Sequence, residues 1–153
     1  MIYLDTHVLV WLHAGELDRF TARGRQLMEQ NDLLISPCVK LELQYLFEVG
    51  RTTVPAVRIF EDLDAQIGLT VCDIAFDIVV HRALAFNWSR DPFDRLISAH
   101  ALCRGIPLLT KAITNLTKGL ELPDEYPIRR ECLYHLGLAD IVDGQDEKAA
   151  KTE

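Results

Sequence analysis

Residues 91–110 read DPFDRLISAHALCRGIPLLT, a stretch in which the best-marked helix of the chain leads directly into a strand. Asp91 is a good N-cap, Pro92 fits the first helical position, and Gly105 is a typical helix stop. The apolar run IPLLT after the glycine predicts a buried strand over 106–110. Such a helix-to-strand unit is typical of α/β domains with parallel sheets.

The same alternation of strand and helix extends back to the N-terminus. Further strands are predicted at 1–5 (MIYLD), within 31–37 (NDLLISP) and at 69–74 (LTVCDI). Further helices are predicted over Arg19–Gln30, Ser36–Gly50, Val54–Ala65 and Phe76–Asn87. At 153 residues, 49% of them hydrophobic, the chain can build one domain with its own core. We therefore expect a three-layer α/β/α domain with a mainly parallel central sheet.

Charge is unevenly distributed along the chain, whose net charge is −7. Residues 119–153 hold nine acids against four Lys or Arg, a balance of −5, which leaves 1–118 at 12 minus 14, or −2. We expect a domain over 1–118 and a divergent acidic C-terminal extension over 119–153. The final run DGQDEKAAKTE has the composition of a disordered segment.

Cysteine spacing and hydropathy indicate a cytoplasmic protein. Cys38, Cys72, Cys103 and Cys132 form no CxxC or similar pair, so we expect reduced, mostly buried thiols. The first residues lack the basic stretch and small-residue cleavage site of a secretory signal. No apolar run approaches the length of a membrane span, and we expect no membrane association.

Three acids stand in apolar neighbourhoods, where an unpaired carboxylate costs several kcal/mol. Asp5 ends the run MIYLD, Glu42 lies inside PCVKLELQYLF, and Asp94 sits in the first turn of the helix after Asp91. Ligand sites of parallel sheets form beyond the carboxyl ends of the strands, so these acids can converge there. Carboxylate oxygens suit a hard cation such as Mg²⁺ or Mn²⁺.

The placement of Glu42 depends on its helix face. Its i−4, i−3, i+3 and i+4 neighbours are Cys38, Val39, Tyr45 and Leu46. A face made of these residues is expected to pack inward and to carry Glu42 with it.

Each acid also has a structural explanation. Asp5 could cap the helix that follows it, and Glu42 could extend out of its apolar stripe. Asp94 in a first helical turn is favoured by the helix dipole alone. For Asp91, the N-cap position before Pro92 is the preferred explanation.

The segments YLDTHVLVW, SPCVKLEL and DPFDRLISAHAL followed by GIPLLT resemble, in order and spacing, a PIN domain. The DPFDRLI form is similar to the VapC-type toxins of bacterial toxin–antitoxin pairs. The resemblance, which runs from Met1 to about Thr110, implies a ribonuclease dependent on Mg²⁺ or Mn²⁺. It implies that the catalytic and metal-binding acids are Asp5, Glu42 and Asp94, with Asp91 a nearby extra carboxylate. An RNA substrate, an antitoxin partner and a homodimer follow from the same resemblance.

The chain departs from that family's pattern after the last predicted strand. Members commonly place a fourth acid there in a T-x-D arrangement, whereas this chain has Thr110-Lys111-Ala112. Asn115 or Asp91 could offer a substitute oxygen.

We expect substrate contacts from residues around the same site. They are Thr6 and Thr110 beside the strand ends, Arg95 and Arg90 beside DPFD, and Lys111.

Two functions from different classes follow from these patterns. The first is a metal-dependent endoribonuclease, whose acids hold the cation that attracts RNA. The second is a PIN-like RNA- or protein-binding module that is catalytically impaired because the acid expected at Ala112 is absent.

Overall fold

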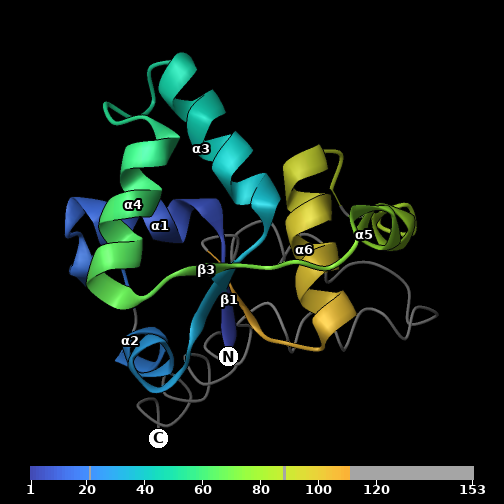
Figure 1. Cartoon of the computed structure of the whole chain (residues 1–153), viewed down its shortest axis with the longest axis horizontal. Helices are drawn as coiled ribbons and strands as arrows, with labels where there is room; N and C mark the ends of the chain where they lie inside the picture. The colour runs from blue at the N-terminus through green and yellow to red at the C-terminus, as the bar shows by residue number, and fades with distance from the viewer. Residues whose placement is uncertain (21, 88, 111–153) are drawn as a thin grey trace, which may run out of the picture.

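A four-stranded parallel sheet organises this computed structural model, which describes residues 1–20, 22–87 and 89–110 (Figure 1). The strands are β1 (Ile2–Leu4), β2 (Leu33–Ile35), β3 (Thr70–Val71) and β4 (Leu108–Leu109). The helices are α1 (Thr6–Ala14), α2 (Ala22–Gln30), α3 (Pro37–Glu48), α4 (Ala56–Ile67), α5 (Phe76–Ala83) and α6 (Pro92–Arg104), with a short 3₁₀ turn η1 (Leu17–Arg19). The predicted acidic extension 119–153 lies outside the described residues.

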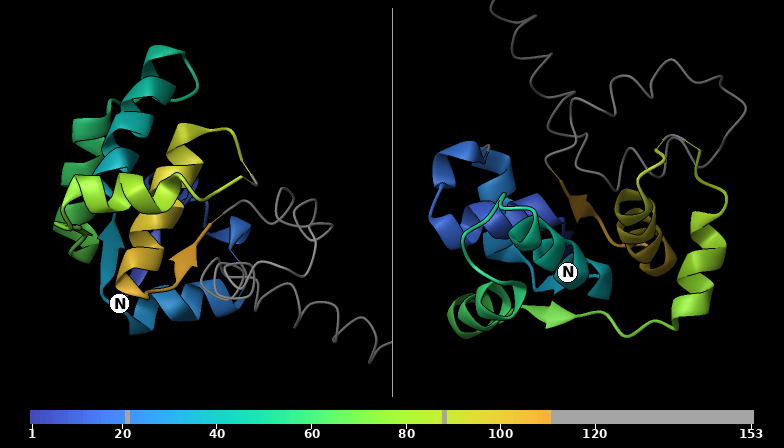
Figure 2. Two further views of the ribbon diagram at one scale, coloured as in Figure 1. Left: turned by 90° about the vertical axis from the view of Figure 1, so that its right-hand side faces the viewer. Right: turned by 90° about the horizontal axis from the view of Figure 1, so that it is seen from above.

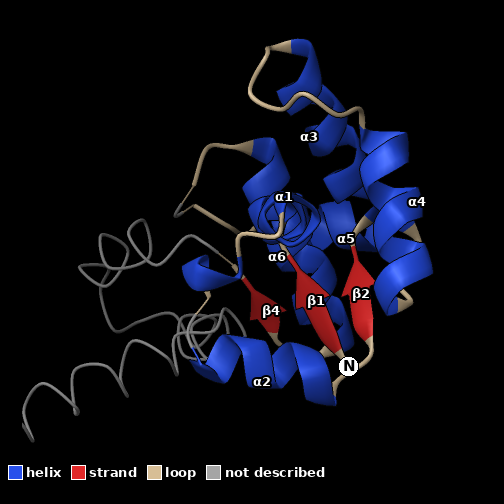
Figure 3. Ribbon diagram, turned by 90° about the vertical axis from the view of Figure 1, so that its left-hand side faces the viewer, coloured by secondary structure: helices blue, strands red, loops and turns tan. Residues whose placement is uncertain are grey.

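The strand order is β3-β2-β1-β4, and every neighbouring pair is parallel. In Figure 1, α1, α2 and α4 lie on one side of the strands and α5 and α6 on the other, and the view from above in Figure 2 agrees. Figure 3 shows β4, β1 and β2 side by side between these helices. The predicted three-layer α/β/α fold with a parallel sheet is therefore confirmed.

The residues of β1, β2 and β4 are apolar or aromatic and buried because helices cover both faces of the sheet, whereas Thr70 of the edge strand β3 is exposed. Every residue of β1 and β2 is buried, and Tyr3, Leu4 and Ile35 are fully enclosed. Leu43 of α3 and Ile97 of α6 pack into the same core. No helix within the described ranges combines the length and apolar character needed to cross a membrane.

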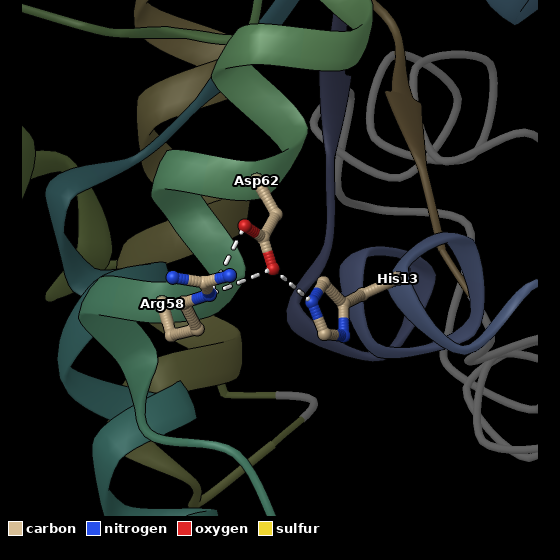
Figure 4. A network of polar contacts seen from close by, with 3 residues as sticks. All are labelled: His13, Arg58 and Asp62. Atoms are coloured by element: carbon tan, nitrogen blue, oxygen red, sulfur yellow. Dashed lines mark hydrogen bonds and ion pairs between the residues drawn. The ribbon is translucent and has the colours of Figure 1, made fainter.

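A polar network joins α1 to α4 at the edge of the core (Figure 4). His13 Nε2 lies 2.8 Å from Asp62 Oδ2, and Arg58 Nε donates to the same oxygen at 3.2 Å. The hydrogen bond with His13 holds the pKa of Asp62 below its usual range. Because His13 ends α1 and Asp62 lies mid-way along α4, the network fixes the two helices against each other.

The predicted helix Arg19–Gln30 was wrong at its start. Leu17–Arg19 form the 3₁₀ turn instead, and the α-helix begins at Ala22. Phe20 interrupts the helical backbone because it adopts an extended conformation and is buried against the core.

The observed α4 lies two residues farther along the chain than the predicted helix Val54–Ala65, because a proline sets its start and a glycine its end. The observed α4 begins after Pro55, since the residue before a proline disfavours helical geometry. It ends at Gly68, whose positive φ of 68° closes the last turn.

The predicted strand at 69–74 was too long. The observed β3 holds two residues, because it is an edge strand that pairs through Leu34 and Ile35 with the short β2. After the Cys72 N–H donates to Ile35 O at 2.8 Å, the chain turns away toward α5.

The predicted helix Phe76–Asn87 ends at Ala83 instead. Its last carbonyls are taken by Arg95 of α6, whose guanidinium donates to Ala83 O at 2.9 Å and to Leu84 O at 3.3 Å. The following N–H groups of Ala85 and Phe86 bond three residues back, which tightens the chain out of the α-helix. A side chain from another element therefore decides this boundary.

Ser36 joins the start of α3 to α6. Its Oγ accepts from Cys38 N–H at 3.1 Å as the predicted N-cap and lies 2.9 Å from His100 Nδ1. Both Ser36 and His100 are fully buried, and burial lowers the pKa of His100. The imidazole is thus neutral in the folded protein, and stability falls as the pH drops below about 6.5, where the unfolded histidine gains a proton.

Replacing Ser36 with alanine is expected to lower the free energy of unfolding by about 2–4 kcal/mol. Loss of the cap costs about 1 kcal/mol, and an unpaired buried imidazole nitrogen about 1–3 more. Urea unfolding at pH 7.5 measures the change. Ser98→Ala, a buried serine within α6 rather than at a cap, is the matched control and should lose less than about 1 kcal/mol.

Candidate active site

Asp5 is held at the carboxyl end of the sheet by its neighbours on both sides. Its backbone N–H donates to Leu109 O of β4 at 3.0 Å, which places it beside Thr110. Oδ1 accepts from the Thr6 N–H at 2.8 Å, and Oδ2 accepts from the Thr110 hydroxyl at 2.7 Å. Asp5 therefore caps α1, as its structural explanation predicted, and also has a fixed carboxylate orientation.

Glu42 points inward from α3, as the helix-face prediction required. It is 8% exposed, and its Oε2 is buried without a hydrogen-bond partner. Burial first, and then the charges of Asp5, Asp91 and Asp94, raise its pKa to about 8. Its carboxyl group is therefore mostly protonated at neutral pH in the metal-free protein.

Asp94 occupies the first turn of α6 beside Asp91. Asp91 Oδ1 accepts from Phe93 N–H at 2.8 Å and from Asp94 N–H at 3.4 Å, so the predicted N-cap is confirmed. The Ser89 hydroxyl donates to Asp94 Oδ2 at 3.1 Å. Burial, followed by the charges of Asp91 and Asp5, raises the pKa of Asp94 to about 6.

The three predicted acids thus come from different elements and lie close enough that, besides burial, their charges raise the pKa values of Glu42 and Asp94. Asp5 follows β1, Glu42 lies on α3, and Asp94 begins α6. Within the described ranges, no Lys or Arg forms an ion pair with any of them. Four carboxyl groups, with Asp91 included, therefore lie close together, and the described residues provide no Lys or Arg that pairs with them.

This donor set fits a divalent cation. A buried carboxylate oxygen without a partner, as at Glu42, is stabilised when a cation ligates it. In the described part of the chain, no three His, Cys, Asp or Glu side chains already stand at metal-binding distances. Ligation of one cation by all three acids therefore requires their carboxyl groups to move closer together.

Comparison with known proteins identifies the family to which the chain belongs. The family model described as PIN domain matches residues 2–111. The chain belongs to the PIN domain family. The match covers the strands and helices that carry the three acids.

A solved structure shares the fold of this PIN domain. It is a chain of VapBC2 from Rickettsia felis bound to a DNA fragment from their promoter. The TM-score is 0.53 and the sequence identity is 23%, with 74% of this chain and 90% of that chain covered. No curated protein matches this sequence significantly.

Two residues predicted to contact substrate face the interior or another helix of the PIN domain. Thr6 is fully buried, and its hydroxyl oxygen has no hydrogen-bond partner among the described residues. Arg95 directs its guanidinium to the end of α5 through Ala83 O and Leu84 O. Neither side chain is presented to a substrate here, whereas Arg90 is exposed.

Thr110 was predicted to face the site, and its hydrogen bond to Asp5 places it there. Lys111, Ala112 and Asn115 lie outside the described residues.

Ser89 is a site residue that sequence reasoning missed. Its Oγ accepts from the Asp91 N–H at 3.1 Å while donating to Asp94, so it connects the two acids. A serine two residues before an N-cap is a weak sequence signal, because serine is common in loops. The sequence clue was the position alone, two residues before Asp91 of DPFD.

Removing the Ser89 hydroxyl is expected to weaken Mn²⁺ binding by about 10-fold, because Asp94 Oδ2 loses the group that orients it. Ser89→Ala and Ser89→Thr should be compared by calorimetric titration with Mn²⁺. Ser89→Thr keeps the hydroxyl and should retain affinity. Equal affinity for Ser89→Ala and the wild type would contradict the orienting role.

Proposed function

We propose that this PIN domain is an endoribonuclease dependent on Mg²⁺ or Mn²⁺, and that it is the toxin of a type II toxin–antitoxin pair. One observation carries the proposal: Asp5, Glu42 and Asp94 converge without a basic partner among the described residues, and Glu42 Oε2 is buried without a hydrogen bond. An isolated cluster of this kind is costly unless a cation joins it.

The three acids hold the cation in this proposal, and Asp91 adds negative charge at the edge of the site. Thr110 and Ser89 each fix one carboxylate oxygen, of Asp5 and of Asp94 respectively. Glu42 gives up its proton when it becomes a ligand. When bound, the cation neutralises phosphate charge and lowers the pKa of a water that attacks the phosphodiester.

RNA and an antitoxin are proposed as partners from likeness to VapC-type toxins. The DPFDRLI sequence is similar to those toxins, and the structural neighbour is a VapBC2 complex bound to promoter DNA. A segment of the antitoxin that brings a basic residue toward the acids would complement their charge. We place the protein in the cytoplasm, where Cys38, Cys72 and Cys103 would persist as free thiols.

A homodimer is the proposed quaternary state. The apolar surface of α5 supports it, since Phe76, Ile78 and Leu84 are all exposed and Leu84 is 69% accessible. Light scattering of the purified chain should give twice the monomer mass. Leu84→Ser is expected to shift the mass toward the monomer, and a wild-type monomer would contradict the dimer.

Cleavage of an RNA pool tests the nuclease directly. The pool should contain structured and single-stranded molecules, and the protein should be free of any antitoxin. Cleavage is expected with Mg²⁺ or Mn²⁺, should stop in EDTA, and should return when excess metal is added. Cleavage that continues in EDTA would contradict the proposal.

The alternative is a catalytically impaired RNA- or protein-binding module. Ala112 favours it, because the family's fourth acid commonly occupies that position. In that case the folded protein binds RNA or a partner without turnover in either metal. Ala112→Asp would then be expected to produce cleavage.

A further inference from the structure

An aromatic pair joins α3 and α6, the two helices that carry Glu42 and Asp94. Tyr45 of α3 and Phe93 of α6 have ring centroids 6.4 Å apart with planes inclined by 30°. Phe93 is half-buried, whereas Tyr45 is 52% exposed, although the sequence predicted an inward-facing Tyr45. A large aromatic residue left open to water next to another ring offers a flat apolar surface to a ligand.

Both rings belong to residues that lie close to the carboxylates along the chain. Tyr45 lies one helical turn beyond Glu42, and Phe93 directly precedes Asp94. The charges of Asp91 and Asp94 act on Glu42, so α3 and α6 face each other at the level of the acids as well as at the rings. The aromatic pair therefore borders the site on its outer side.

We propose that Tyr45 and Phe93 form a stacking platform for an unpaired RNA base next to the phosphate on which the acids act. The inference rests on the proposed ribonuclease function and adds the two residues that hold a base beside the reacting phosphate. Aromatic rings stack on any base face, and a base held in a duplex is unavailable to them.

Stacking, and not protein charge, is the source of RNA affinity that this surface offers. Residues 1–118 carry a balance of 12 basic against 14 acidic side chains, so no excess of positive charge attracts the RNA backbone. The acids repel phosphates unless a cation is bound. Stacking supplies affinity that does not depend on protein charge. A base stacked on the two rings would place the neighbouring phosphate at the acids.

A second protein chain is the competing occupant of this surface. Leu41, one turn before Tyr45 on α3, is 63% exposed and would belong to the same contact. A protein interface would depend on Leu41 and Tyr45 together, whereas base stacking depends on the aromatic ring. The two occupants thus predict different behaviour for Leu41→Ala.

The experiment compares Tyr45→Ala, Tyr45→Phe and the control Leu41→Ala. Steady-state cleavage of a short single-stranded RNA gives kcat and KM for each variant. Titration of the same RNA against each variant in an Asp94→Asn background, at saturating Mn²⁺, gives Kd. Tyr45→Ala is expected to raise KM and Kd about 10-fold or more while lowering kcat less. Tyr45→Phe and Leu41→Ala should match their parent proteins, and a fully duplexed form of the RNA should bind weakly to all.

The outcomes separate this inference from the proposed function. If the wild type binds the RNA without cleaving it, the nuclease proposal fails, while the Kd comparison still decides the platform. Unchanged Kd in Tyr45→Ala, or no RNA binding by any form, would overturn the platform. A shift in mass by light scattering for both Tyr45→Ala and Leu41→Ala would overturn it as well, because the pair would then be a contact between chains.

Discussion

Replacing Asp94 with asparagine is expected to lower kcat/KM for RNA cleavage by more than about 100-fold. Asparagine keeps the size of the side chain in the first turn of α6 but removes the negative charge that the cation needs. Loss of a group that merely orients a metal ligand already costs about 10–100-fold, so loss of the ligand's charge should cost more. Initial rates at saturating Mg²⁺ measure the effect.

Asp77→Asn is the matched control for this comparison. Asp77 is also an acid in the first turn of a helix, but it is exposed on α5. It shares the favourable interaction with the helix dipole and lacks the neighbouring carboxylates. Cleavage by Asp77→Asn should equal that of the wild type, and equal rates for Asp94→Asn and Asp77→Asn would refute the role given to Asp94.

Replacing Glu42 with glutamine is expected to stabilise the metal-free protein at alkaline pH. The folded pKa of Glu42 is about 8, above the ordinary value of 4.5. A group with a raised folded pKa stabilises fully below the unfolded pKa and loses that contribution as the pH rises through the folded pKa. The wild type should therefore lose stability between about pH 4.5 and pH 8, whereas glutamine mimics the neutral acid at every pH.

The expected difference at pH 9 is roughly 2–4 kcal/mol in favour of Glu42→Gln, after allowance for water near the site. At pH 4.5 the two proteins should be about equally stable. Urea unfolding in EDTA across this pH range measures the difference in the free energy of unfolding. Both proteins contain His100, so its effect on stability at low pH is the same in each and does not contribute to the difference.

Glu61→Gln, an exposed substitution on α4, controls for loss of one negative charge and should follow the wild type. Saturating Mn²⁺ at pH 9 should reverse the order by stabilising the wild type more than Glu42→Gln. A difference that does not change with pH would show that Glu42 titrates normally in the folded protein.

Local signals predicted the parts of the fold that local chemistry decides. Asp91, Pro92 and Gly105 bounded α6 correctly, since a cap, a fixed φ and a positive φ act within one turn. The end of α5 was mispredicted because Arg95 from another helix takes its last carbonyls. No pattern within α5 itself carries that information.

The same distinction holds for the site. The apolar neighbours of Glu42 predicted its burial, and the strand end predicted the position of Asp5. The internal roles of Thr6 and Ser89 depend on side-chain directions in the folded chain, which residue spacing does not specify. Tyr45 was predicted to pack inward because it shares a helix face with Glu42. It is instead 52% exposed, one turn farther along α3, where it contacts the ring of Phe93.

A calorimetric titration with Mn²⁺ tests most directly whether Asp5, Glu42 and Asp94 form one cation site, because binding must precede metal-assisted cleavage. At pH 7 the wild type is expected to bind with release of close to one proton, since Glu42 has a pKa of about 8 before binding. Repeating the titration in buffers of different ionisation enthalpy measures that proton. Asp5→Asn and Asp94→Asn should weaken binding by more than about 100-fold. Equal Mn²⁺ affinity in the wild type and both variants would contradict the account.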